Sequence, residues 1–79
     1  MQMAPQFNGR PFGRDWLNQV FRAKTAAQGG VLRRRIADVE REVGRAEFEL
    51  EVRRRGFRLI ECGGHFVVIC TCDPIRIIC

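Results

Sequence analysis

The clearest hydrophobic period in the chain lies in its middle third. Apolar residues recur there at intervals of three, four, three and four: Ile36, Val39, Val43, Ala46 and Leu50. This spacing places the side chains on one face of an α-helix. It predicts a helix over about 38–55, with Asp38 as the N-cap and Gly56 as the C-terminal stop.

Gly44 interrupts that helical pattern. Glycine costs about 1 kcal/mol inside a helix, and Phe48 and Val52, which follow it, fall on a different face from the residues before it. A division of the segment into two shorter helices at Gly44 is therefore the alternative prediction.

An earlier segment, 14–27, has a second helical period. Its apolar side chains share one face: Trp16, Leu17, Val20, Phe21, Ala23 and Ala27. The pattern predicts an amphipathic helix that ends before Gly29-Gly30. Residues 1–12 contain Pro5, Gly9 and Pro11 and are predicted to form an irregular arm.

A hairpin is predicted around Gly63-Gly64. The flanking segments, 57–62 and 65–71, are rich in β-forming residues. Pairing across the turn places Phe57, Leu59, Phe66, Val68 and Cys70 on one face, interrupted by Glu61. We expect the helices to cover this face, whereas the other is only half apolar.

Two segments compete to be the third strand. In the first, residues 31–35, a strand would place Leu32 and Arg34 on one face and Arg33 and Arg35 on the other. The second, residues 75–79, follows Pro74 and would form a short edge strand or a packed extension. The predicted fold class is α+β: a small three-stranded antiparallel sheet surrounded by about three α-helices, in a single compact domain, 1–79.

Arginine dominates the charge. Lys24 is the only lysine among fourteen basic residues, against nine acidic ones, and the net charge is +5. Arginine's planar group suits phosphate and carboxylate ligands, so an anionic partner is expected. The candidate partner-binding residues are Arg33, Arg34, Arg35, Arg53, Arg54, Arg55 and Arg58. For the second triplet, pairing with Glu47, Glu49 and Glu51 on the same helix is the competing interpretation.

The four cysteines do not predict a metal site. Their spacing lacks the paired Cys-x-x-Cys of structural zinc sites. Across the predicted turn Cys62 lies opposite His65 and Cys70 lies opposite Phe57, so neither faces another cysteine. Two disulfides remain possible alternatives. One is a bridge within the chain between Cys72 and Cys79, and the other is an intermolecular bridge, with Cys70 as its candidate residue, that implies a homodimer.

Catalysis is not expected from these residues. A chain of 79 residues builds a thin core, and the Cys62–His65 pair has no third group to orient it. We therefore expect a non-enzymatic protein without catalytic residues, cofactor or metal. The N-terminus lacks a continuous apolar segment of the secretory type, which predicts a cytoplasmic location without membrane insertion.

Residues 29–70, GGVLRRRIADVEREVGRAEFELEVRRRGFRLIECGGHFVVIC, carry a resemblance to a known group. The stretch resembles small phage and prophage proteins of alphaproteobacteria, in particular the Rhodobacter anti-CRISPR inhibitors of the type I-C CRISPR-Cas system. The resemblance implies a compact fold of three antiparallel strands and three helices. It also implies a protein of the bacterial host cell that binds the Cascade surveillance complex and blocks recruitment of target DNA.

Two modes of contact with Cascade are consistent with the composition. Arginines can bind acidic protein surfaces, or the long helix can present an acidic patch made of Asp38, Glu40, Glu42, Glu47, Glu49 and Glu51. The alternative function is a small basic phage regulator that binds DNA directly through phosphate contacts from the Arg clusters.

Overall fold

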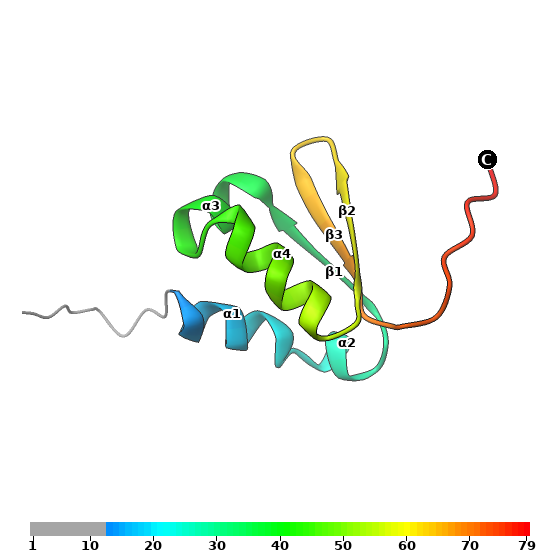
Figure 1. Cartoon of the computed structure of the whole chain (residues 1–79), viewed down its shortest axis with the longest axis horizontal. Helices are drawn as coiled ribbons and strands as arrows, with labels where there is room; N and C mark the ends of the chain where they lie inside the picture. Colours follow the sequence, from blue (N-terminus) through cyan, green and yellow to red (C-terminus); the bar gives the residue numbers. More distant parts are fainter. Residues whose placement is uncertain (1–12) are drawn as a thin grey trace, which may run out of the picture.

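A computed structural model describes residues 13–79, so the predicted arm, 1–12, lies outside the described residues. Within residues 13–79, four helices and three strands follow one another (Figure 1). They are α1 (Arg14–Phe21), α2 (Lys24–Ala27), β1 (Val31–Arg35), α3 (Ile36–Glu42), α4 (Arg45–Arg54), β2 (Arg58–Cys62) and β3 (His65–Ile69). The α+β class predicted from the sequence is confirmed.

The sheet is antiparallel throughout, with strand order β1-β3-β2. The predicted hairpin joins β2 to β3, and Cys62 pairs with His65 across the turn. Gly63 and Gly64 have φ angles of 54° and 77°, a left-handed conformation that two-residue hairpin turns require and that glycine adopts without strain.

The third strand is β1, which pairs along its whole length with the central strand β3. The prediction of an edge strand over 75–79 is wrong, because no strand is formed after Ile69. The C-terminal segment instead runs away from the folded elements (Figure 1), and Ile75, Ile77 and Ile78 are exposed.

Both predicted helices are divided. The first ends at Phe21, because Ala23 adopts an extended conformation with ψ 147° before α2 begins. The prediction of one continuous helix over 14–27 is therefore wrong, and Ala26 rather than Ala27 is buried. The second breaks at Gly44, as the alternative predicted, where φ is 90° and ψ is 149°. Only glycine reaches such a conformation readily.

The start of α3 also differs from the prediction. Arg35, not Asp38, occupies the N-cap position, and Asp38 lies in the first helical turn. An acidic residue in that turn still complements the helix dipole. The amide of Ile36 donates to the carbonyl oxygen of Gly64 at 3.0 Å, so α3 begins directly against the hairpin turn.

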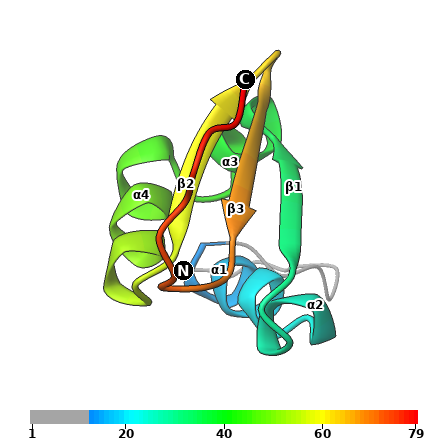
Figure 2. The ribbon, with the colours of Figure 1, turned by 90° about the vertical axis from the view of Figure 1, so that its right-hand side faces the viewer.

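The helices pack on one face of the sheet, and Figure 2 looks onto the opposite face. The core between the layers is made of Leu17, Val20, Phe21, Ala26, Leu32, Val39, Phe48, Val52, Phe66, Val68 and Cys70. The rings of Phe48 and Phe66 stack at its centre, with centroids 5.5 Å apart. Ala46 and Leu50, predicted on the buried face, are exposed, because the break at Gly44 gives α4 its own orientation.

Candidate functional site

The face of the sheet that the helices leave uncovered, called here the open face, combines arginines with apolar residues. The pairing register aligns its side chains in three rows across β1, β3 and β2, because partners in adjacent strands point to the same side. The rows are Val31–Ile69–Arg58, Arg33–Val67–Ile60 and Arg35–His65–Cys62.

Three arginines of the open face are available to a partner. Arg33, Arg35 and Arg58 are exposed, and within residues 13–79 none of them forms an ion pair with a carboxylate. Arg33 and Arg35 lie two residues apart on the β1 edge. Arg58 lies on the β2 edge, two strands away and one row along from Arg33, which places their backbones about 12 Å apart.

The centre of the open face is apolar. Val67 and Ile69 of the middle strand are half-buried by their neighbours, while Val31 is 53% and Ile60 is 41% exposed. An apolar centre with arginines at both edges has the composition of a protein-binding surface, where apolar contacts and Arg contribute most of the affinity. The nine residues of the open face include no Phe, Tyr or Trp, and these are the large rings on which nucleic-acid bases stack.

Arg34, the middle residue of the first triplet, lies apart from Arg33 and Arg35. It aligns with Phe66 and Glu61 on the helix-covered face, and one of its guanidinium nitrogens donates to the carbonyl oxygen of Arg33 at 2.6 Å. Strand alternation thus divides the triplet between the two faces of the sheet.

The second triplet lies at the end of α4, and two of its arginines have an internal partner. The side chain of Glu51 is only 2% exposed and accepts a hydrogen bond from Arg55 at 2.7 Å, with Arg54 at 3.6 Å. The guanidinium of Arg55 also lies over the ring of Phe21, 4.7 Å from its centroid. These contacts favour the competing interpretation for Arg54 and Arg55, namely pairing with the helix's own glutamate.

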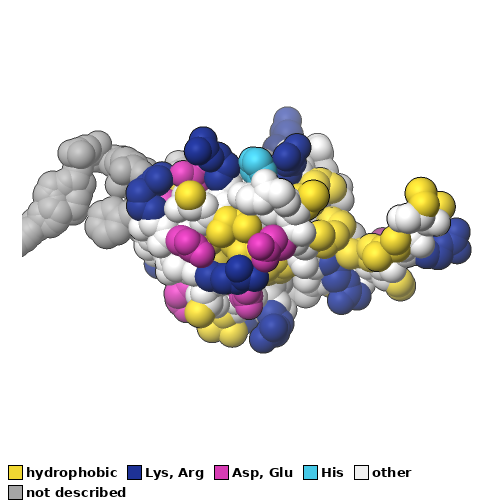
Figure 3. Space-filling model, turned by 90° about the horizontal axis from the view of Figure 1, so that it is seen from above, with side chains coloured by type: hydrophobic (Ala, Val, Ile, Leu, Met, Phe, Trp, Pro, Cys, Tyr) yellow, Lys and Arg dark blue, Asp and Glu magenta, His cyan; other side chains and the backbone are white. Residues whose placement is uncertain are grey.

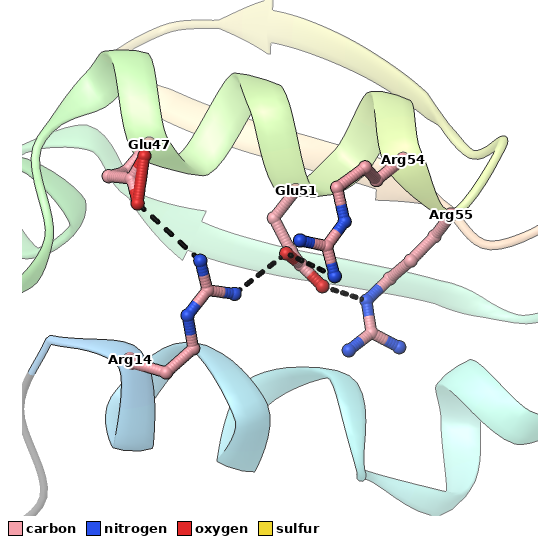
Figure 4. A network of polar contacts seen from close by, with 5 residues as sticks. All are labelled: Arg14, Glu47, Glu51, Arg54 and Arg55. Carbon is pink, nitrogen blue, oxygen red and sulfur yellow. Dashed lines mark hydrogen bonds and ion pairs between the residues drawn. The ribbon is translucent and has the colours of Figure 1, made fainter.

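Arg14 completes this network and was not foreseen from the sequence. It reaches from α1 to Glu51 at 2.9 Å and to Glu47 at 3.5 Å (Figure 4). Burial raises the pKa of Glu51, but the hydrogen bonds from Arg14 and Arg55 and the charges of Arg55 and Arg54 lower it, and the net pKa lies below its ordinary value. The i, i+4 spacing of Glu51 and Arg55 was visible in the sequence, whereas nothing marked Arg14 as a partner 37 residues away.

The acidic patch expected on the long helix is not presented as a surface. The side chains of Glu51 and Glu42 are 2% and 5% exposed. Most of the remaining carboxylates are engaged: Asp38 by Arg41 at 3.0 Å, Glu47 by Arg14 at 3.5 Å and Glu49 by Arg45 at 2.8 Å. Free positive charge, rather than free negative charge, therefore characterises the described surface.

The cysteines are all free thiols, so the Cys72–Cys79 bridge is not formed. Cys70 is only 4% exposed, and its sulfur lies 3.9 Å from the carbonyl oxygen of Val68. Burial raises the pKa of this thiol, and the charge of Arg55 offsets part of the rise. This burial disfavours contact between the Cys70 sulfur and a second chain, and the intermolecular disulfide stays a prediction.

The Cys62–His65 pair lies at the end of the hairpin. The Nδ1 atom of His65 is 3.2 Å from the carbonyl oxygen of Gly63, and no side chain of residues 13–79 orients the ring. In the same part of the chain no three His, Cys, Asp or Glu residues come together to hold a metal ion.

No family model matches the sequence, and no match was found among curated proteins or solved structures. Among residues 13–79 no helix has the length and apolar character needed to cross a membrane.

Proposed function

We propose that this chain is a non-enzymatic inhibitor that binds the type I-C Cascade complex through the open face and blocks recruitment of target DNA. The resemblance of residues 29–70 to anti-CRISPR proteins supports the choice of partner. The proposed mode of contact rests on one observation: Arg33, Arg35 and Arg58, which have no ion pair within residues 13–79, surround an apolar centre. All nine residues of the open face fall within the stretch that carries the resemblance.

The charge distribution favours contact with acidic protein surfaces over imitation of DNA. A DNA mimic needs a row of unpaired carboxylates, whereas the carboxylates of Glu47, Glu49 and Glu51 pair with the chain's own arginines. The unpaired arginines instead complement acidic side chains of a partner, and such complementarity speeds association and fixes orientation. Inhibition then follows from steric obstruction, because a cationic protein does not compete for the cationic groups that hold DNA.

Co-elution tests the proposal. The protein is mixed with purified type I-C Cascade in reducing buffer at physiological salt and separated on a sizing column. The expected result is a stoichiometric complex with the wild-type chain. Absence of the wild-type chain from the Cascade fractions, when it is added in excess over Cascade, overturns the proposal.

A charge-reversal variant tests the open face itself. Arg33→Glu combined with Arg35→Glu places two acidic groups on the β1 edge, and we expect the complex to be lost. Arg22→Glu is the matched control, since Arg22 is exposed, lies at the end of α1 and has no ion pair within residues 13–79. Equal binding by the double variant and the control contradicts the role of the open face.

A second candidate function rests on the same arginines. A small DNA-binding regulator would use Arg33, Arg35 and Arg58 as phosphate contacts. Its affinity for naked duplex DNA then falls with salt, by about 0.9 logarithmic unit per tenfold increase for each phosphate contact. Measured affinity for duplex DNA with that salt dependence, together with no binding to Cascade, favours the regulator.

A further inference from the structure

A groove separate from the centre of the open face runs between α4 and the outer edge of β2. Its volume is about 400 Å³. Apolar side chains form its floor: Val52 from α4, Phe57, Leu59 from β2, and Phe66 from β3. From above, hydrophobic side chains are visible in the middle of the molecule between acidic and basic groups (Figure 3).

The strand that borders the groove is an edge strand. β2 pairs only with β3, so its other side has no neighbouring strand within residues 13–79. In an antiparallel pair every second residue directs its N–H and C=O away from the partner. β2 therefore offers unpaired backbone donors and acceptors beside an apolar groove, an arrangement that accepts an added strand.

The two ends of the groove differ in charge. Arg45 lies over the ring of Phe66, 5.2 Å from its centroid, and is neutralised by Glu49 at 2.8 Å and Glu61 at 2.9 Å. Arg53 and Arg58, which also line the groove, have no ion pair among the described residues. Three arginines against two carboxylates give the groove lining a net charge of +1, and the arginines without an ion pair lie at the Arg53 and Arg58 end.

We propose that this groove binds an extended segment of a partner protein with alternating apolar and acidic residues, which pairs with β2 as a fourth strand. Side chains of an added strand alternate between the two faces of the sheet. Apolar residues of the segment would then fill the groove over Leu59 and Phe66, and its carboxylates would lie on the side of Arg58. Arg53, on α4, binds a carboxylate near the end of the segment.

The chain's own C-terminal segment does not line the groove. The chain passes the C-terminal end of α4 at Cys72, whose sulfur leaves no room for a side chain at Gly56. The residues after Pro74 include three isoleucines, of which Ile77 is 84% exposed, yet they extend away from β2 (Figure 1). This segment carries Arg76 beside its isoleucines, so its side chains at 75–78 do not supply the carboxylates that would complement Arg53 and Arg58.

Synthetic peptides test the proposal with the full chain and without Cascade, so its outcome is separate from that of the inhibitor function. The probe is an acetylated, amidated seven-residue peptide that alternates Asp and Ile. We expect it to shift the backbone amide resonances of Leu59, Ile60 and Glu61 and to bind at least tenfold more tightly than the matching Lys and Ile peptide. Equal affinity of the two peptides, or shifts confined to other elements, overturns the proposal.

Two further comparisons separate strand addition from charge attraction. Replacing the central Ile of the probe by proline removes a backbone donor and interrupts the extended segment, so binding should weaken at least tenfold. Combining Arg53→Glu with Arg58→Glu should have an effect of similar size, whereas Arg22→Glu should not. Binding that survives the proline replacement contradicts strand pairing, and binding unaffected by the double charge reversal contradicts the assigned partner chemistry.

Discussion

The carboxylate of Glu51 and the guanidinium of Arg55 are joined by a 2.7 Å hydrogen bond one turn apart on α4. Arg14 approaches the same carboxylate from α1 at 2.9 Å, so a buried acid links two helices that are distant in sequence. The arginines themselves remain partly exposed, between 33% and 63% for Arg55, Arg14 and Arg54. The acid is thus the buried member on which the network depends.

Replacement of Glu51 by alanine should destabilise the protein by about 2–3 kcal/mol, because charge-assisted hydrogen bonds to a buried group are lost while the arginines remain hydrated. Urea unfolding measures the change. Glu40→Ala is the control, since Glu40 is an exposed acid on α3, and its effect should stay within about 0.5 kcal/mol. Equal effects of the two substitutions would refute the structural role of Glu51.

Stability should fall in acid partly through Glu51. Its pKa in the folded protein lies below the ordinary value, so the folded state favours the ionised form. The stabilisation is fully present above the unfolded pKa of about 4.3 and is lost as the pH falls through the lower folded pKa. Unfolding free energies measured between pH 7 and pH 3 should decline less in Glu51→Gln than in the wild type. Parallel pH profiles of the two proteins contradict the assignment.

Alanine substitutions at two apolar residues of α4 test the orientation of this helix. Phe48 is fully buried between the rings of Trp16, Phe21 and Phe66, so Phe48→Ala should cost about 3–5 kcal/mol. Leu50 is 50% exposed, and Leu50→Ala should cost less than about 1 kcal/mol. Thermal or urea unfolding measures both, and the reverse order would support the uninterrupted helix suggested by the spacing of residues 36–50.

Thiol labelling tests the placement of the cysteines. Cys62, Cys72 and Cys79 are exposed, whereas Cys70 is buried with a raised pKa, and the reactive species is the thiolate. Treatment of the reduced, folded protein with iodoacetamide should modify three cysteines and spare Cys70 until denaturant is added. Mass spectrometry of proteolytic fragments reads out each site. Rapid modification of Cys70 under native conditions would show that its burial is incomplete.

Local features of this fold were predictable from the sequence because short-range geometry determines them. Gly63-Gly64 supplies the left-handed turn of the hairpin, and alternation within 57–62 and 65–71 identifies the face that the helices cover. The break at Gly44 was also visible as an alternative. The break turns Phe48 and Val52 of α4 toward the core. The sequence indicated this only in part, by placing these two residues on a different helical face from the apolar residues before Gly44.

The candidate surfaces depended on contacts between distant segments and could not be derived in the same way. Arg33 and Arg58 share the open face only because β3 pairs with both β1 and β2. Arg54 and Arg55 are drawn to Glu51, while Arg53 on the same turn remains unpaired beside the groove. Composition shows that the chain is rich in arginine, but tertiary packing decides which arginines have no ion pair among residues 13–79.

The most direct test of the proposed function is the binding of a fluorescently labelled target duplex by purified type I-C Cascade, measured in reducing buffer with saturating amounts of this protein. The account predicts that the wild-type chain and Arg22→Glu abolish DNA binding, whereas Arg33→Glu combined with Arg35→Glu leaves it intact. Unchanged binding of the duplex in the presence of the saturating wild-type chain would contradict the account.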